Sequence, residues 1–492
     1  MKIKFVFLAI LMIFALLFST CEFLSDNDNN NNNENNNNGN GPITGDTAYD
    51  EIIALAKRLC DELEYDWSTR DDYTGAIPKQ TPGKRHRQCN GYAIEMMEKA
   101  IMIESVKTVQ HWRATKDTGA PGNHSWNIIK LIDGRILFCD LTAFATNRIN
   151  TETGEVYHAA DYRWEKITFD EEEFKTKSPN TSYYPHGMLL EEARAPGFMS
   201  GVGTAENPFV ITKAEQLAAI SLWVRAMDSA LMETYNAAHY KLGNNIDLSE
   251  YAPTTSLAWK PIGTPSRSFL GVFDGNSKVI SGLTISPTST YDWGLFGYVR
   301  GSKIKNLGIE IIVINGISQI GGIAGTLSES AVISNCYTTG EITASGVNIG
   351  GIAGWIREGS IVENCYSTVD IKGSGSRVGG LVGNINGTES TVRNSAALNP
   401  SVVGNTNVAR VYGLWSAGTT RPNNIAFSDM LSGTTDFNNK TLTGSGGLDF
   451  SASQIRADGT LGGRFTAVNG WTVENGKLPG FGASRILPDY IR

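Results

Sequence analysis

Four short glycine phrases recur at nearly constant spacing in the second half of the chain, and this repetition restricts the possible folds more than any other feature. Gly-Leu-Phe-Gly begins at residue 294, Gly-Ile-Ala-Gly at 322 and again at 351, and Gly-Leu-Val-Gly at 380, at intervals of 28, 29 and 29 residues. A weaker Gly413-Leu414 continues the series. Similarity at a fixed period is typical of one supersecondary unit stacked many times. We therefore expect a solenoid, and not a two-sheet sandwich, in this region.

A second series of apolar positions lies between the glycine phrases. It comprises Ile280, Ile304, Ile333, Val362 and Val392, and three residues after each of them Leu283, Leu307, Cys336, Cys365 and Ser395. The units are rich in Val, Ile, Thr and Gly without a helical period, so each is predicted to be one coil of an all-β, right-handed β-helix. Glycines would mark corners, where a positive backbone angle or close coil packing is needed.

The two cysteines of this series would lie one above the other in neighbouring coils. Parallel-stacked side chains suit a disulfide poorly. We therefore expect Cys336 and Cys365 to be two buried thiols, flanked by Leu307 and Ser395.

The repeats resemble the GLUG motif, which is named for its Gly-Leu-x-Gly phrase and is common in large bacterial surface proteins. We expect residues 196–418 to form the β-helix, with the helical stretch Lys213–Tyr235 capping its first coil. Residues 419–492 are expected to form a C-terminal capping region that shields the last edge. Because no calcium-binding repeat or consistent pair of carboxylates marks a coil face, the solenoid is interpreted as a spacer or a binding surface.

The beginning of the chain has the pattern of an export signal. In residues 1–20 a short positive start precedes Phe5–Phe18, an apolar segment too short to span a bilayer comfortably. The phrase ending in Cys21 resembles a bacterial lipoprotein processing site, which implies a lipidated Cys21; an ordinary secretory signal is the alternative. Residues 21–45 are an Asn-rich linker that cannot bury apolar surface, so we expect disorder there.

Cys89 is the first candidate functional residue, and it stands in a region, residues 46–195, with the pattern of an α+β domain. A helix is predicted within 46–64, and a second helical pattern begins at Cys89. The apolar faces of these two helices contain Ile52, Leu55, Leu59 and Leu63, and Ala93, Met96, Met97 and Ala100. The exposed amides and the macrodipole at a helix start favour a thiolate, and the basic run at 84–87 acts in the same direction.

His124 and Asp140 are the other two candidates, and both are predicted to lie on one hairpin. His124–Leu131 has the pattern of a strand and Arg135–Leu141 that of the return strand. A two-residue Asp-Gly loop would place Asp140 opposite Asn127, on the other face from His124. A three-residue loop with a left-handed Gly134 would place Asp140 opposite Trp126, diagonal to His124 on the same face.

These phrases resemble the transglutaminase-like superfamily, whose core architecture is related to papain-type cysteine proteases. Its bacterial members have Cys-x-Gly-Tyr-Ala at a helix start, His-x-Trp-Asn on one strand, and Asp, often followed by Thr, at the end of the next. The resemblance implies that Cys89 is the nucleophile, His124 the base and acid, and Asp140 the residue that orients the histidine. Leu141 stands where the family usually has proline, and Ile136 where it has an aromatic residue, so the substrate cleft can differ.

The sequence therefore favours an exported, lipid-anchored cysteine acyltransferase or amide hydrolase at the cell envelope. Its expected partners are a protein or peptide substrate, a cell-wall peptide or polysaccharide, and the membrane, through the lipid on Cys21. No cofactor or metal is expected. A net charge of −8, with no basic tail, argues against nucleic acid. A non-catalytic surface-binding protein with the same domains remains the alternative.

Overall fold

The computed structural model describes residues 46–65, 85–87, 89–113, 125–139, 148–149, 156–157, 167–168, 188–194, 196, 199–227, 229–255, 258–286, 292–433 and 436–492. All of them belong to one unit, Ile43–Arg492. The predicted signal, Cys21 and the Asn-rich linker lie outside the described residues. Within the described part of the chain, no helix combines the length and the apolar character that crossing a membrane requires.

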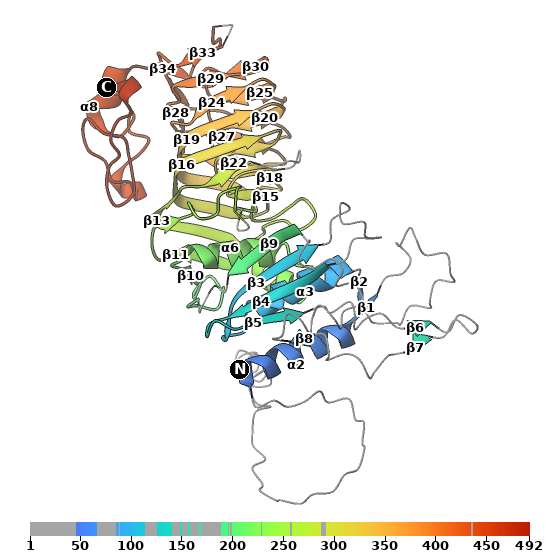
Figure 1. Cartoon of the computed structure of the whole chain (residues 1–492). Coiled ribbons are helices and arrows are strands. Elements are labelled where there is room, and N and C mark those ends of the chain that lie inside the picture. The colour runs from blue at the N-terminus through green and yellow to red at the C-terminus, as the bar shows by residue number, and fades with distance from the viewer. Residues whose placement is uncertain are drawn as a thin grey trace, which may run out of the picture. The chain divides into compact units, whose positions relative to one another are not determined.

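The N-terminal part of this unit combines helices with an antiparallel sheet (Figure 1). Among the described residues, five strands form the sheet in the order β8 (Ile167–Thr168), β5 (Ile136–Cys139), β4 (Ser125–Leu131), β3 (Val106–Arg113) and β9 (Met188–Arg194). The other elements of this part are α2 (Thr47–Glu62), β1 (Leu63–Tyr65), β2 (Arg85–Arg87), α3 (Cys89–Ala100), β6 (Arg148–Ile149) and β7 (Val156–Tyr157).

The predicted apolar faces of both helices are buried in one core with the sheet. Ile52 and Leu59 of α2, and Met96 of α3, are fully buried in the same cluster as Ile129 of β4 and Leu137 of β5. The 3.6-residue period therefore predicted these inward positions of both helices correctly. Leu63, which was expected on the face of the first helix, belongs to β1 instead.

Parallel strands form the second part, a right-handed type of β-solenoid with about 7 turns over residues 209–432 (Figure 1). Its largest sheet contains β10 (Phe209–Ile211), β11 (His239–Leu242), β12 (Ile246–Asp247), β13 (Val272–Ser281), β14 (Thr284–Ile285), β16 (Lys303–Gly316), β19 (Val332–Ala344), β22 (Ile361–Glu363), β23 (Tyr366–Ser367), β24 (Asp370–Gly373), β27 (Thr391–Arg393), β28 (Ala396–Ala397), β29 (Ser401–Val403), β32 (Ile425–Phe427), β33 (Leu431–Ser432) and β34 (Leu448–Phe450).

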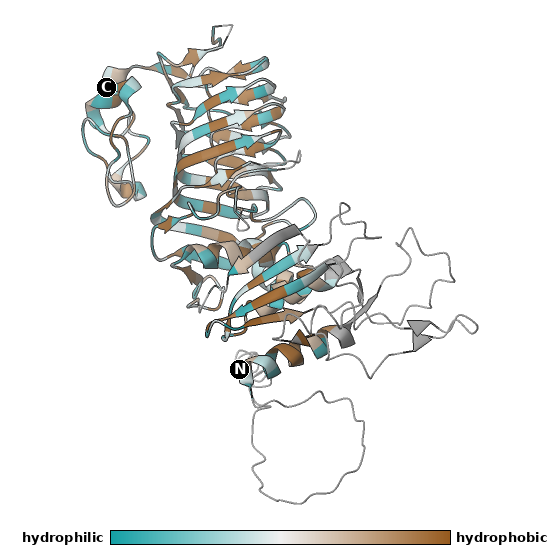
Figure 2. Cartoon of the chain, in the orientation of Figure 1, coloured by the Kyte–Doolittle hydropathy of each residue, from teal (hydrophilic) through white to brown (hydrophobic). Residues whose placement is uncertain are grey.

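Two smaller sheets complete the coils. One contains β15 (Phe296–Arg300), β18 (Ala324–Ser328), β21 (Ala353–Ile356), β26 (Val382–Ile385) and β31 (Tyr412–Trp415); the other contains β17 (Ile320–Gly321), β20 (Val347–Gly350), β25 (Ser376–Gly379) and β30 (Thr406–Ala409). Figure 2 shows apolar residues along the stacked strands. The helices of this part are α6 (Ala214–Val224), α7 (Ser229–Asn236) and α8 (Ala452–Asp458), with short 3-10 turns at Ala467–Asn469 and Asp489–Ile491.

The glycine phrases occupy equivalent positions in successive coils, as their spacing predicts. Backbone hydrogen bonds run from the Gly322 N–H to the Gly351 carbonyl at 3.1 Å and from the Gly351 N–H to the Gly380 carbonyl at 3.2 Å. A Cβ built on Gly351 would lie 2.4 Å from the Gly380 carbonyl oxygen. Gly294, Gly322, Gly351 and Gly380 are not among the residues with positive φ. Close coil packing, rather than a left-handed backbone, therefore explains glycine here.

The fifth coil departs from this pattern. The register Val382 opposite Tyr412 places Arg410, not a glycine, in the column of Gly380. The Arg410 side chain is completely buried. Its guanidinium donates to the Gly446 carbonyl at 2.7 Å and to the Gly447 carbonyl at 2.9 Å, and it pairs with Asp449 at 2.6 Å. The assignment of Gly413-Leu414 to the start of the phrase was therefore wrong, because Gly413 is in register with Gly383, the second glycine, and Leu414 lies opposite Asn384. The position of the first glycine holds an arginine that binds the C-terminal region.

The start of the second apolar series was assigned wrongly. Ile304, Ile333, Val362 and Val392 do stack. However, the residue opposite Ile304 is Phe273, whereas Ile280 lies opposite Ile309. A bulge between Asp274 and Lys278 inserts extra residues into β13, and this irregularity hid the true period of the first coil.

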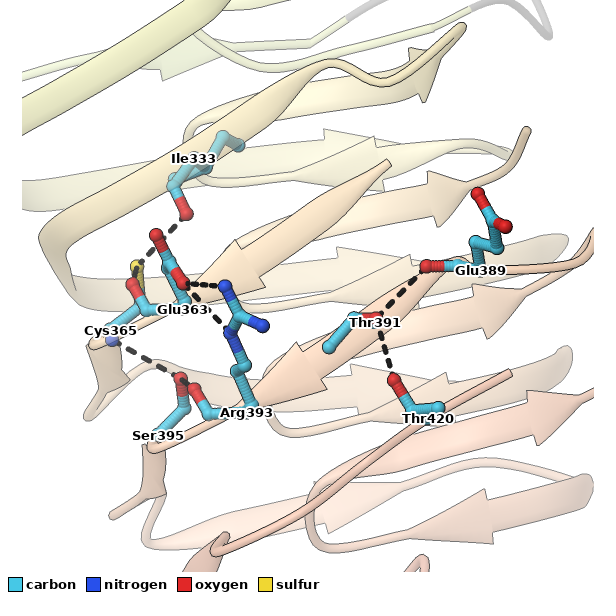
Figure 3. A network of polar contacts seen from close by, with 8 residues as sticks. All are labelled: Ile333, Glu363, Cys365, Glu389, Thr391, Arg393, Ser395 and Thr420. Atoms are coloured by element: carbon cyan, nitrogen blue, oxygen red, sulfur yellow. Dashed lines mark hydrogen bonds and ion pairs between the residues drawn. The ribbon is translucent and has the colours of Figure 1, made fainter. Parts of the chain in front are cut away.

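Cys336 and Cys365 lie in adjacent coils and are free, buried thiols, as expected. Leu307 is opposite Cys336 on one side, and the Cys365 N–H donates to the Ser395 hydroxyl on the other (Figure 3). Burial raises the pKa of the Cys365 thiol, with a further contribution from its hydrogen bond to Cys336. The Cys365 thiol is therefore protonated and unreactive at neutral pH.

The C-terminal region extends beyond the last coil. β34 adds a parallel strand to β32. The chain then runs back beside the large sheet (Figure 1), where the Tyr366 hydroxyl donates to the Pro479 carbonyl at 2.5 Å and Arg485 pairs with Glu310 at 2.5 Å. The rings of Tyr337, Tyr366, Phe465, Trp471 and Phe481 form one aromatic cluster between segment and sheet. This region therefore covers the side of several coils as well as their end.

The close approach at the glycine column predicts the effect of adding one methyl group. Gly351→Ala should lower the free energy of unfolding by about 3 kcal/mol, because backbone of the neighbouring coil must move to admit a Cβ. Gly433→Ala is the matched control, since its nearest neighbour is a Val403 methyl group at 3.0 Å. Urea denaturation followed by circular dichroism measures both, and equal stability losses would contradict this explanation.

The thiol stack makes a second prediction. In the native protein neither Cys336 nor Cys365 should be alkylated by iodoacetamide, because both are inaccessible, whereas both should react in full after denaturation. Peptide mass spectrometry without reduction measures this. A disulfide-linked peptide containing both cysteines would show that the stacked geometry has been misread.

Candidate active site

The ends of one helix and two strands lie together at one end of the N-terminal sheet. The chain leaves α3, turns through residues 101–105 and returns in β3. β3 pairs antiparallel with β4, and β4 antiparallel with β5. The N-terminal end of α3, the N-terminal end of β4 and the C-terminal end of β5 therefore lie at the same end of the sheet.

The predicted triad occupies or adjoins these ends in the sequence. Cys89 is the first residue of α3, as predicted. His124 immediately precedes β4, and Asp140 immediately follows β5. His124 and Asp140 themselves lie outside the described residues, and so does lipidation candidate Cys21.

The hairpin has the loop that the triad requires. Asn127 is opposite Cys139, and the Leu131 N–H donates to the Arg135 carbonyl at 2.9 Å, so the loop has three residues. Its last residue, Gly134, has a φ of +92°. The three-residue loop was the alternative that keeps His124 and Asp140 on one face, and it is confirmed.

The motif asparagine joins the two elements that lead to the site. Asn127 is buried, and its amide donates to the Ala93 carbonyl in α3 at 3.0 Å and to the Gln110 carbonyl in β3 at 3.4 Å. These bonds fix the first turns of α3 against the strand that follows His124. The asparagine of the His-x-Trp-Asn phrase is thus a structural contact that sequence reasoning left without a role.

Strand alternation sets a condition on catalysis. One face of the hairpin packs against α3, and it carries Asn127, Ile129 and Cys139. The last two belong to the same core cluster as the buried residues of α3. Trp126 lies on the opposite face of β4. Regular alternation before Ser125 would continue the Trp126 face at position 124. Catalysis by Cys89 and His124 therefore requires the chain to turn out of regular strand geometry where β4 begins.

The solenoid contains a ladder that sequence reasoning missed. The ladder consists of one asparagine per coil, each with a positive φ and each just before the position of the Cys336 and Cys365 stack. Its members are Asn306, Asn335, Asn364, Asn394 and Asn423. Asparagine tolerates the left-handed conformation, and Asn423 donates to the Asn394 side chain at 2.8 Å. The signal in the sequence was an asparagine just before Leu307, Cys336, Cys365 and Ser395.

Outward residues beside this ladder form ion pairs between neighbouring coils. Lys305 pairs with Asp274 at 3.1 Å, and Arg393 pairs with Glu363 at 2.6 Å (Figure 3). Such pairs neutralise one another, so this column presents no consistent acidic face in the coils that the structure describes. Across the described part of the chain, no group of three or more His, Cys, Asp or Glu side chains is placed to hold a metal ion.

Comparisons with known proteins match only parts of the chain. No protein-family model matches it. It is 32% identical over 141 residues to the "Putative Gly-rich membrane protein" of Evansella cellulosilytica, covering 28% of this chain and 15% of that protein. It is 32% identical over 130 residues to the halomucin of Haloquadratum walsbyi, covering 26% of this chain and 1% of that protein. The chain thus spans a small fraction of the length of these relatives.

Two solved structures are also similar to it. One is described as a "putative immunoglobulin A1 protease" from Bacteroides ovatus, with a TM-score of 0.43 and 20% identity, covering 57% of this chain and 94% of that one. The other is an IgA1 protease, with a TM-score of 0.35 and 15% identity, covering 70% of this chain and 26% of that one. These similarities are too low to carry an argument about fold or activity.

Proposed function

We propose that this protein is an exported cysteine acyltransferase or amide hydrolase of the transglutaminase-like type, acting through a thioester on Cys89. The observation that carries the proposal is that the ends of one helix and two strands lie together at one end of the sheet. The start of α3, where Cys89 stands, lies at the same end of the sheet as the strand ends that adjoin His124 and Asp140. The three-residue hairpin loop, which keeps the last two positions in register, supports it.

The chemistry follows from these residue types. A thiol at the first residue of a helix lies beside unpaired amides and the positive end of the helix dipole, which favour the thiolate. His124 would take the thiol proton, and Asp140 would hold the imidazole in the correct orientation. The thiolate would attack an amide carbonyl of a protein or peptide, and water or an amine would release the acyl group. The Cys89 amide is the natural first donor to the anionic intermediate.

The remaining domains would place this chemistry at the cell envelope. A lipid on Cys21 would anchor the chain, the Asn-rich linker would act as a flexible tether, and the solenoid would serve as a spacer or surface-binding module. Relatives described as a Gly-rich membrane protein and a halomucin support an envelope location. A cell-wall peptide or polysaccharide is the proposed partner of this surface.

A non-catalytic surface-binding protein is the second candidate. The observation in its favour is that α3 packs on the Asn127 face of β4, opposite Trp126. If the strand alternates regularly up to position 124, His124 is directed away from the helix that begins with Cys89. The domain would then keep its fold while lacking a general base.

Substitutions in the triad distinguish the two candidates. Cys89→Ala should reduce amine incorporation into glutamine peptides, or their hydrolysis, to background, because the nucleophile is lost. Asp140→Asn should lower kcat by at least about 100-fold, since the histidine loses its orienting partner. Cys139→Ala is the matched control in the same domain and should retain the activity. Equal activity of wild type and Cys89→Ala would reject the enzyme.

The anchor is tested by mass spectrometry of the mature protein purified from membranes. We expect the first residue to be Cys21 carrying a diacylglycerol, and Cys21→Ser should release the protein from the membrane fraction. A mature chain that begins elsewhere and lacks Cys21 would show an ordinary secretory signal.

A further inference from the structure

A buried glutamate connects α3 to the first helix of the solenoid. Glu98 lies nine residues after Cys89 on α3, and it is 1% exposed. Its carboxylate accepts a hydrogen bond from the Met227 N–H at 2.9 Å, just beyond the end of α6. Its backbone carbonyl accepts one from the Trp223 indole at 3.3 Å.

The second bond completes the end of α3. The last four carbonyls of a helix have no partner within it, and here they belong to residues 97–100. The turn that follows satisfies three of them: Ile101 donates to Met97, Met102 to Lys99, and Ile103 to Ala100. The fourth is the Glu98 carbonyl, and the solenoid supplies its donor.

The donor is itself held rigidly. Trp223 is 2% exposed, and its ring stacks on Tyr235 of α7 with centroids 4.4 Å apart. At the rim of the same junction, Arg194 at the end of β9 pairs with Glu250 at 2.6 Å. The junction thus has a buried core with two bonds to one glutamate, which is the arrangement of a rigid connection rather than of a hinge.

We propose that Glu98 and Trp223 are positioning residues for Cys89: the solenoid anchors the C-terminal end of α3, and the helix transmits that position to the thiol at its other end. The inference rests on the proposed function for its catalytic meaning. It predicts that the acyl-transfer domain reaches full reactivity only when α6 is docked, so the solenoid is a required part of the enzyme and not a passive carrier.

The test uses the full chain with Trp223→Phe, which removes the indole N–H and keeps an aromatic ring. Glu98→Ala removes the carboxylate, and Glu98→Gln keeps an oxygen acceptor for Met227. Trp415→Phe is the matched control, because Trp415 is 40% exposed on β31 at the far end of the solenoid.

Two readouts are measured: the pH dependence of Cys89 alkylation by iodoacetamide, and hydrogen exchange of the α3 amides. Losing one hydrogen bond should slow alkylation at neutral pH about fivefold and speed exchange in the first half of α3 about fivefold. We expect this for Trp223→Phe and Glu98→Ala, with Glu98→Gln and Trp415→Phe close to wild type.

The outcomes separate the two proposals. Faster exchange confined to the C-terminal half of α3, with the Cys89 pH profile unchanged, would reduce the junction to a structural contact and overturn the inference. Full activity of Cys89→Ala would instead remove the proposed enzyme, while the exchange data would still report whether α6 controls the start of α3.

Discussion

The solenoid depends on how closely its coils approach one another at one corner. The Gly351 and Gly380 backbones are directly hydrogen-bonded there, and a Cβ would collide with the next carbonyl oxygen. This contact lets the parallel strands on either side keep a continuous ladder through the turn. It also couples neighbouring coils, because the backbone of one coil occupies the space that a Cβ on the glycine of the next coil would need. The stacked Cys336 and Cys365, and the asparagine ladder, depend on the register that this corner maintains.

The same column explains how the repetition ends. Arg410 occupies the glycine position of the fifth coil, and its buried guanidinium is satisfied by carbonyls and Asp449 of the C-terminal region. The buried Arg410 side chain thereby attaches the segment that closes the solenoid. The segment then returns along the large sheet to Glu310, three coils earlier by sequence register. The same C-terminal segment therefore both ends the stack of coils and covers the side of the large sheet.

At the other end, the solenoid begins where the α+β part ends. α6 contributes Trp223 to a core that also contains Met96 of α3, so the two parts share buried surface. The hydrogen bonds of Glu98 also fix the orientation of α6 relative to α3, because hydrogen bonds are directional and apolar packing is not. A signal received by the solenoid would reach the helix of the candidate nucleophile through this junction. Under the proposed function, this junction would couple binding by the solenoid to chemistry at Cys89.

Local pattern by itself determined the coil architecture, the inward faces of α2 and α3, the helix start at Cys89 and the candidate positions of His124 and Asp140. These follow from period and from short phrases, which depend only on nearby residues. The hairpin loop was reduced to two alternatives, and the paired strands selected one. Tertiary structure alone decided that Arg410 replaces a glycine, that a bulge in β13 offsets Ile280, and that Trp223 completes α3. Each of these involves residues far apart in the chain, and only packing brings such partners together.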